Sequence, residues 1–156
     1  MDKTNKIKIR KAKRSDFNNI LRLISELAEF EKLNPPDRSA NKRLRKDAFS
    51  KNPYFKILLA ESGKDIIGYA FYFFTYSSFM ARKTLYLEDI FISDKYRNKG
   101  IGRMFFEKLK STAKKSECAR MEWVVLDWNI NAIKFYDKLG ASELTEWKTY
   151  RLHLQS

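Results

Sequence analysis

Two kinds of side chain that build many catalytic and structural sites are nearly absent from this chain. Its 156 residues include one cysteine, Cys118, and one histidine, His153. A single cysteine excludes an internal disulfide framework and a cysteine-rich zinc site. A single histidine excludes a multi-histidine metal centre and argues against a nucleophile–histidine–acid triad. We therefore expect no metal site in this protein.

Proline, glycine and long apolar runs are also scarce. With 3 Pro, 5 Gly and 44% hydrophobic residues, the composition excludes collagen-like, low-complexity and wholly disordered chains. The uncharged apolar stretch of residues 66–79 is too short to cross a bilayer. The basic residues 1–14 are not followed by the apolar segment of a signal peptide. We expect one domain over residues 1–156, located in the cytoplasm and without a membrane partner.

Negative charge is the third shortage. The chain has 19 Asp and Glu against 32 Lys and Arg, and the net charge of +13 favours an anionic partner. The excess lies in residues 1–14, 38–64 and 95–120, whereas residues 15–37 and 65–94 are net acidic. The basic blocks 1–14 and 42–46 could bind nucleic acid. No recognition motif accompanies them, so this partner is not favoured.

Apolar periodicity predicts a mixed α/β chain. We expect strands at residues 7–12, 56–61, 66–75, 84–92, 120–126 and 147–154. We expect four helices. The first has Ser15 as its N-cap and ends before Asn34, and the second lies at about 41–50. The third runs from about Gly100 to near Cys118, and the fourth lies at 130–139. The third of these helices should bury Ile101, Met104, Phe105 and Leu109.

The segment Arg97-Asn-Lys-Gly-Ile-Gly-Arg103 joins a predicted strand to a predicted helix. Its glycines, Gly100 and Gly102, let backbone N–H groups approach a ligand without obstruction by a Cβ atom. The helix N-terminus adds unpaired donors and a partial positive charge, and Arg97, Lys99 and Arg103 add full charges. An ordinary turn would explain the glycines alone. With the cations, the segment indicates a pyrophosphate site, although it is neither a Walker loop nor a complete dinucleotide fingerprint.

Two segments together resemble the GCN5-related N-acetyltransferase (GNAT) family. RNKGIG matches the Arg/Gln-x-x-Gly-x-Gly/Ala signature, and residues 129–141 match the Asn-x-x-Ala-x-x-Phe-Tyr…Gly-Ala/Phe hallmark. The segments ILRLISELAEFEKL, GYAFYFFTYSSF and LYLEDIF are similar to the spermidine/spermine (diamine) and thialysine N-acetyltransferase branch. The resemblance implies a GNAT fold, in which helices flank a mixed, mostly antiparallel sheet whose fourth and fifth strands splay apart.

The same resemblance implies acetyl-CoA bound between the splayed strands. The cofactor-binding residues that it implies are Ile90, Phe91, Ile92, Arg97, Asn98, Lys99, Gly100, Ile101, Gly102, Arg103, Asn129, Asn131 and Ala132. It places Tyr136 beside the thioester sulfur, where the phenol would protonate the departing thiolate. The amine would attack the thioester directly, within a ternary complex, and a backbone N–H near Phe91 would stabilise the oxyanion.

An alkylammonium acceptor has a pKa of about 10, so a base must remove its proton near neutral pH. Glu88 is the first candidate, acting directly or through water, and Asp89 is the second. On a regular strand these neighbours point to opposite faces, so they should share one task only if the strand is bulged.

The acceptor is inferred from carboxylates and aromatic rings, which suit a flexible polycation. The substrate-binding residues implied by the family are Phe30, Glu31, Glu88, Asp89, Glu122, Trp123 and Val124. They predict a polyamine or diamine-like amine. Because a +13 protein repels a polyamine at long range, thialysine or lysine-type amino acids are alternative acceptors. The basic blocks leave protein N-termini as another alternative.

Two further expectations concern partners. The family branch implies a homodimer, for which the aromatic run Tyr69–Tyr76 and the final predicted strand offer apolar area. A non-enzymatic alternative is a basic nucleic-acid-binding module built on the same scaffold.

Overall fold

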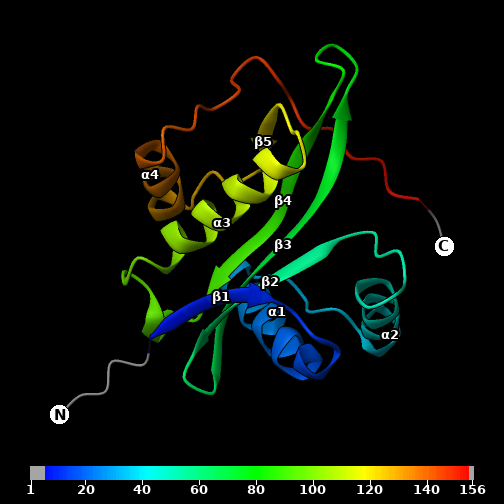
Figure 1. The fold of residues 1–156 in the computed structure, drawn as a ribbon, viewed down its shortest axis with the longest axis vertical. Helices are drawn as coiled ribbons and strands as arrows, with labels where there is room; N and C mark the ends of the chain where they lie inside the picture. The colour runs from blue at the N-terminus through cyan, green and yellow to red at the C-terminus, as the bar shows by residue number, and fades with distance from the viewer. Residues whose placement is uncertain (1–5, 155–156) are drawn as a thin grey trace. The chain divides into compact units, whose positions relative to one another are not determined.

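Five strands form one sheet in the longer of two parts of the chain (Figure 1). The computed structural model describes residues 6–154, and the chain divides into two compact units, one ending at Trp123 and one beginning at Val124. The strands are β1 (Ile7–Lys11), β2 (Lys56–Ser62), β3 (Asp65–Ser77), β4 (Arg82–Ile92) and β5 (Arg120–Glu122). Their order is β1-β2-β3-β4-β5; the first four are antiparallel, and β5 pairs parallel to β4.

Helices cover both faces of this sheet. In the first unit they are α1 (Phe17–Glu31), α2 (Arg38–Ala48) and α3 (Ile101–Lys115), with short 3-10 turns η1 (Arg14–Asp16) and η2 (Asp94–Tyr96). On one face, Ile20 and Leu23 of α1 join a buried cluster with Leu59, Tyr69 and Phe91 of the sheet. On the other face, Tyr72 of β3 lies beside Thr112 of α3. The predicted α/β architecture is thus confirmed. Within residues 6–154, no helix is long and apolar enough to cross a bilayer.

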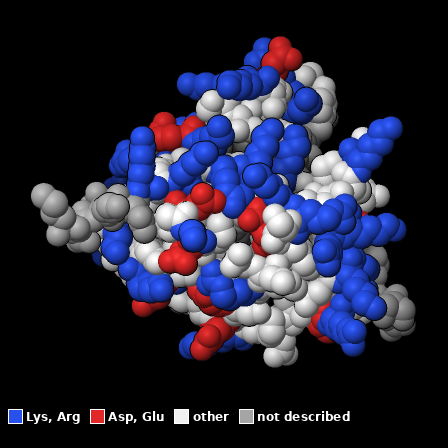
Figure 2. Space-filling model, turned by 60° about the horizontal axis from the view of Figure 1, so that its bottom comes forward, with Lys and Arg blue, Asp and Glu red and all other residues white. Residues whose placement is uncertain are grey.

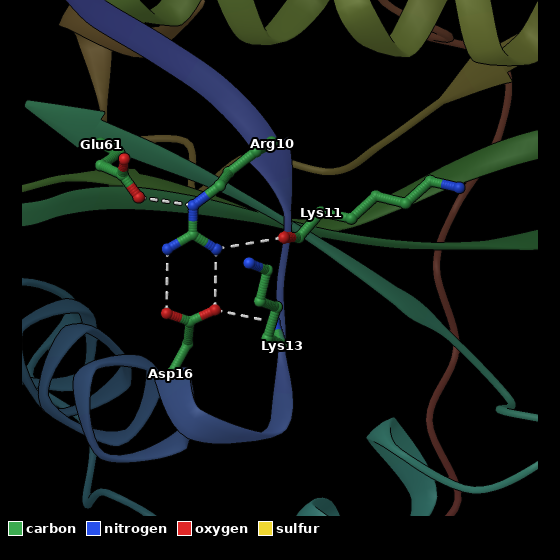
Figure 3. Close-up of polar contacts among 5 residues, drawn as sticks. All are labelled: Arg10, Lys11, Lys13, Asp16 and Glu61. Carbon is green, nitrogen blue, oxygen red and sulfur yellow. Dashed lines mark hydrogen bonds and ion pairs between the residues drawn. The ribbon is translucent and has the colours of Figure 1, made fainter.

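A partly buried ion-pair network fixes the start of α1 against the sheet edge (Figure 3). The guanidinium of Arg10 on β1 donates two parallel hydrogen bonds to Asp16, of 2.8 and 3.0 Å, and a third of 2.5 Å to Glu61 on β2. Asp16 also accepts from the backbone N–H of Lys13, at 2.7 Å. These contacts hold the pKa of Asp16 below its usual value, chiefly through the hydrogen bonds from Arg10.

Three sequence predictions about local structure are wrong. Asp16, and not Ser15, stands at the N-cap of α1, because its carboxylate is drawn into the Arg10 network. The second helix begins at Arg38, since the carboxylate of Asp37 accepts a 2.7 Å hydrogen bond from the backbone of Ala40. Met104 lies on the exposed side of α3, and Phe106 takes a buried position that the periodicity had not assigned.

The two C-terminal strand predictions also need correction. The predicted strand 120–126 is only three residues long, and residues 147–154 form no strand within the described part of the chain. In the second unit, α4 (Ile130–Lys138) is followed by a segment whose large apolar side chains are exposed. These exposed side chains are Leu144, Trp147, Tyr150, Leu152 and Leu154. A strand needs a neighbouring backbone to pair with, and the apolar pattern alone does not supply one.

Candidate functional site

A β-bulge in β4 places two neighbouring carboxylates where a regular strand would not. Phe71 pairs with Asp89 and Tyr72 pairs with Leu87, so Glu88 is the extra residue of the bulge. Leu87 therefore lies opposite Tyr72 on the α3 side, whereas Asp89 turns to the α1 side, where its partner Phe71 packs against the buried cluster. Bulges of this kind commonly re-aim a side chain beside a functional site.

Asp89 is held by a fully buried tyrosine. The hydroxyl of Tyr69, a residue with 0% exposure, donates a 3.2 Å hydrogen bond to Oδ2 of Asp89. Burial, followed by the neighbouring charges of Glu88 and Glu31, raises the pKa of Asp89 to about 6, and the hydrogen bond from Tyr69 partly opposes this. Burial also raises the pKa of Tyr69 far above its usual value, so the phenol stays a proton donor at neutral pH.

Glu31 belongs to the same group of acids. It is the last residue of α1, and burial raises the pKa of its half-buried carboxyl group. Its charge acts on both Tyr69 and Asp89, which places it near them. The structure therefore brings together three of the predicted acceptor residues, Glu31, Glu88 and Asp89, and Glu88 is the exposed member of the three.

Gly68 controls the backbone of β4 beside this group. A Cβ atom added to Gly68 would lie 2.7 Å from the carbonyl oxygen of Phe91 and 3.3 Å from Cα of Ile92. Only a glycine lets β3 lie this close to Phe91 and Ile92, which are two of the residues predicted to bind pantetheine. At the edge of β4 that faces away from β3, only Thr84–Tyr86 pair with β5. Within the described residues, no strand therefore pairs with residues 87–92 at this edge. This unpaired edge corresponds to the expected splay of the fourth and fifth strands.

The segment from Arg97 to Arg103, here called the glycine loop, leads directly into α3. Gly100 is the N-cap residue of α3, with φ +77°, and Asn98 has φ +59°, so both adopt the left-handed conformation. A Cβ atom on Gly100 would meet nothing within 4 Å, and within residues 6–154 no side chain caps the helix. The first turn, from Ile101 to Arg103, thus offers backbone N–H donors toward open space. An open groove of about 510 Å³ begins at Gly100 and Arg103.

Arg97 has a different part in the loop from the other two cations. Its Nε donates a 3.0 Å hydrogen bond to the carbonyl of Ile92, and its guanidinium lies 4.8 Å from the ring centre of Phe30 and 5.3 Å from that of Phe91. Arg97 thereby joins the loop to α1 and β4. Lys99 and Arg103 are exposed and are the cations of the loop that face solvent.

The remaining predicted acceptor residues have other contacts. Glu122 on β5 forms a 2.8 Å ion pair with Arg120, and its charge reaches Tyr86, which Glu88 also influences. Trp123 packs edge-to-face against Phe106 of α3, with ring centres 5.1 Å apart. Val124 begins the second unit and is exposed.

The second unit contains the other predicted cofactor residues and the predicted acid. Asn129 caps α4, where its Oδ1 accepts a 3.2 Å hydrogen bond from the backbone of Ala132, and Asn131 is exposed. Tyr136 is half-buried and contacts the ring of Phe135, with centres 5.6 Å apart. Their predicted roles toward acetyl-CoA stay predictions.

Comparison with known proteins settles the family. The model of the acetyltransferase (GNAT) family matches residues 18–141, which is most of the chain. The chain belongs to the GNAT acetyltransferase family. This match confirms the predicted enzyme class, an acetyltransferase, and members of the family use acetyl-CoA as the acetyl donor.

Relatives of this GNAT acetyltransferase fall in the expected branch. Thialysine N-epsilon-acetyltransferase of Sus scrofa is 41% identical over 154 residues, covering 92% of this chain and 90% of the relative. Spermidine/spermine N(1)-acetyltransferase-like protein 1 of Homo sapiens is 36% identical over 155 residues, covering 93% of this chain but 22% of the relative. The fold matches a possible acetyltransferase from Clostridium difficile 630 with TM-score 0.83, at 22% identity, covering 96% and 99% of the two chains.

Two residues of this GNAT site were missed in the sequence. Gly68 interrupts an otherwise apolar strand, and an isolated glycine there is a signal of close backbone approach. Tyr69 gave no comparable signal, because a tyrosine in a β-strand is most often a core residue. Only the pairing of β3 with β4 shows that its hydroxyl reaches Asp89.

Proposed function

We propose that this acetyltransferase transfers the acetyl group of acetyl-CoA to a primary amine at the end of a short aliphatic chain. The observation that carries the proposal is the group of three carboxylates, Glu31, Glu88 and Asp89, beside the strand that leads into the glycine loop. Such a group attracts an ammonium ion and offers a proton acceptor. Attack on the thioester is direct, within a ternary complex.

The acceptor must lose a proton before it can attack. A carboxylate with a pKa of about 6 is deprotonated at neutral pH, yet it is a stronger base than an ordinary Asp. Asp89 therefore replaces Glu88 as the preferred base. Tyr69 fixes the orientation of the Asp89 carboxylate, while Glu88 and Glu31 add the negative charge that holds the ammonium group.

The loop and the first turn of α3 fit the diphosphate of acetyl-CoA. Left-handed backbone at Asn98 and Gly100, unpaired first-turn donors, and the exposed Lys99 and Arg103 support this assignment. Acetyl-CoA would supply the acetyl group as an activated thioester. The free edge of β4 at Ile90–Ile92 would hold its pantetheine arm, except that the carbonyl of Ile92 already accepts from Arg97.

Residues of the second unit complete the proposal. The family match spans 18–141, which supports treating residues 1–156 as one catalytic domain. In that domain, the phenol of Tyr136 would protonate the departing thiolate, and Asn129, Asn131 and Ala132 would contact the cofactor. These roles rest on the motif at residues 129–141.

A lysine-like acceptor is favoured over a polyamine. The thialysine N-epsilon-acetyltransferase of Sus scrofa is 41% identical to this chain, whereas the spermidine/spermine-type relative is 36% identical. A compact acidic group suits one terminal ammonium. The net charge of +13 also disfavours long-range attraction of a polycation.

An acceptor panel tests this function. Release of CoA from acetyl-CoA would be followed with thialysine, lysine, putrescine, spermidine and a short peptide, with the acetylated product identified by mass spectrometry. We expect the highest kcat/KM with thialysine, and a smaller one with the polyamines. Turnover of the peptide alone would overturn the small-amine proposal.

We also propose a homodimer in the cytoplasm, as the family branch implies. The aromatic run Tyr69–Tyr76 contributes less to an interface than expected, because Tyr69 and Tyr72 are buried in the core of the chain itself. Phe79, at the turn between β3 and β4, is fully exposed, and the large apolar side chains of residues 144–154 are largely exposed. These exposed groups support a dimer, which gel filtration with light scattering would detect.

A further inference from the structure

A second site of positive charge lies away from the glycine loop. An open groove of about 370 Å³ lies between η1 and α2. Its lining consists of four cations, one hydroxyl and one aromatic ring: Arg14, Lys42, Arg45, Lys46, Ser50 and Phe49. Because the glycine loop follows η2 and leads into α3, the proposed acetyl transfer does not account for this groove.

The sequence of α2 explains why the groove is so basic. The helix carries Arg38, Lys42, Arg43, Arg45 and Lys46 but only one acid, Asp47. Its small apolar side is occupied, since Ala48 and the following Phe49 pack against the buried cluster of the first unit. A membrane-binding amphipathic helix needs a free apolar face, and α2 has already used its own. The outward face therefore suits a soluble polyanion better than a lipid surface.

Two of the four cations are held in place. Arg14 donates a 2.9 Å hydrogen bond to the carbonyl of Phe49 and lies 5.8 Å from the centre of its ring. Arg45 lies 5.5 Å from the ring centre of Phe17. In the part of the chain that the structure describes, none of the four forms an ion pair with a carboxylate. None of the four charges is therefore neutralised by a carboxylate, and the two arginines are already oriented, which lowers the cost of binding an anion.

The positive surface is longer than one phosphate group. Beyond the groove, Lys13, Arg38 and Arg43 are exposed on the same two elements or directly beside them. Figure 2 shows the side of the molecule on which Figure 1 labels α1 and α2, and Lys and Arg cover much of it, with Asp and Glu in small separate groups. A series of spaced negative charges fits such a surface better than an isolated ion.

We propose that the groove between η1 and α2 binds the phosphodiester backbone of single-stranded RNA. The four cations of the groove would neutralise successive phosphates. Binding of this kind is independent of sequence and of the acetyl-transfer reaction. It assigns a role to the basic block 42–46, which the proposed acetyl-transfer reaction leaves unassigned.

Fluorescence anisotropy with a labelled 12-nucleotide oligouridine tests the proposal on the full chain. About four neutralised phosphates predict a slope of about −3 in log K against log salt for a single strand. The triple variant K42Q/R45Q/K46Q should reduce that slope to about −1 and weaken binding at least tenfold at low salt. The double variant K42Q/K46Q leaves the Arg45–Phe17 contact intact and should give an intermediate loss.

The matched control is the triple variant K64Q/K114Q/K115Q, which removes the same charge from exposed positions on other elements. It should keep the wild-type slope, and all variants should keep wild-type acetyl transfer without RNA. An equal loss of RNA affinity in both triple variants would overturn the proposed RNA site in the groove. Unchanged RNA binding in K42Q/R45Q/K46Q would overturn it as well. Tighter binding to phosphatidylserine vesicles than to RNA at equal salt would also overturn it.

Discussion

The hydroxyl of Tyr69 donates a 3.2 Å hydrogen bond to Oδ2 of Asp89 from a position with no solvent exposure. The bulge at Glu88 makes this contact possible, because it turns Asp89 to the α1 side of the sheet. The phenol stabilises the charged carboxylate, while burial and the nearby acids stabilise the neutral carboxyl group. The balance leaves a carboxylate poised to accept a proton near neutral pH.

Removing the phenol should move the pH dependence of catalysis. Tyr69→Phe removes the hydrogen bond that stabilises the charged form of Asp89, so the pKa of Asp89 should rise. The acidic limb of the kcat profile should then move to higher pH, with activity at alkaline pH largely kept. Steady-state rates from pH 5 to 9 at saturating amine would measure this.

The neighbouring acid provides a control of opposite sign. Glu88→Gln removes a like charge that raises the pKa of Asp89, so the acidic limb should move to lower pH. If the two variants shift the limb in the same direction, or neither shifts it, the limb does not report Asp89.

A methyl group on Gly68 should damage cofactor binding. Gly68→Ala would place Cβ 2.7 Å from the carbonyl oxygen of Phe91, so the backbone of β4 must move. We expect the free energy of unfolding to fall by roughly 1–3 kcal/mol. We also expect the KM for acetyl-CoA to rise more than the KM for the amine. Thr75→Ala, on the exposed end of the same strand, should change neither value. Unchanged KM for acetyl-CoA in a folded Gly68→Ala protein would contradict the assignment of Ile90–Ile92.

The Arg10–Asp16 pair should contribute a pH-dependent part of stability. Asp16→Asn should lower the free energy of unfolding by about 3 kcal/mol at pH 7, because Arg10 loses its bidentate partner. The pKa of Asp16 is lowered in the folded state, so its contribution is present above the unfolded pKa of about 3.9 and is lost as pH falls through the lower folded value.

Urea unfolding from pH 7 down to pH 2 would follow this difference. The gap between wild type and Asp16→Asn should shrink below about pH 4. Glu61→Gln, which removes the more exposed partner of Arg10, should cost less at pH 7. A constant gap at all pH values would show that the carboxylate charge of Asp16 is not what stabilises the fold.

Local patterns predicted most of the first unit because they report which side of each element is buried. The apolar spacing of α1 and of β2–β4, together with the glycine signal before α3, gave correct elements. The errors have tertiary causes: Asp16 takes the N-cap because Arg10 lies across from it, and 147–154 has no neighbouring strand in the described chain.

The candidate site likewise has features that the residue pattern predicts and features that depend on how the strands pair. The backbone conformation of residues 97–103 could be predicted, because positive φ angles favour Asn and Gly and the structure has them at Asn98 and Gly100. The faces on which Glu88 and Asp89 lie could not be predicted, since a bulge depends on the register of β3 against β4 and leaves no mark in the residue pattern. The hydrogen bond from Tyr69 follows from that register and was missed with it.

The kcat profile of Asp89→Asn against wild type tests the proposed mechanism most directly. With acetyl-CoA and thialysine both saturating, the wild type should lose activity below an apparent pKa of about 6, where Asp89 becomes protonated. Asp89→Asn should lack this limb and be slower by roughly 10²–10⁴-fold at pH 7.5, since the acceptor loses its base. An Asp89→Asn enzyme that keeps both the rate and the acidic limb would contradict the account.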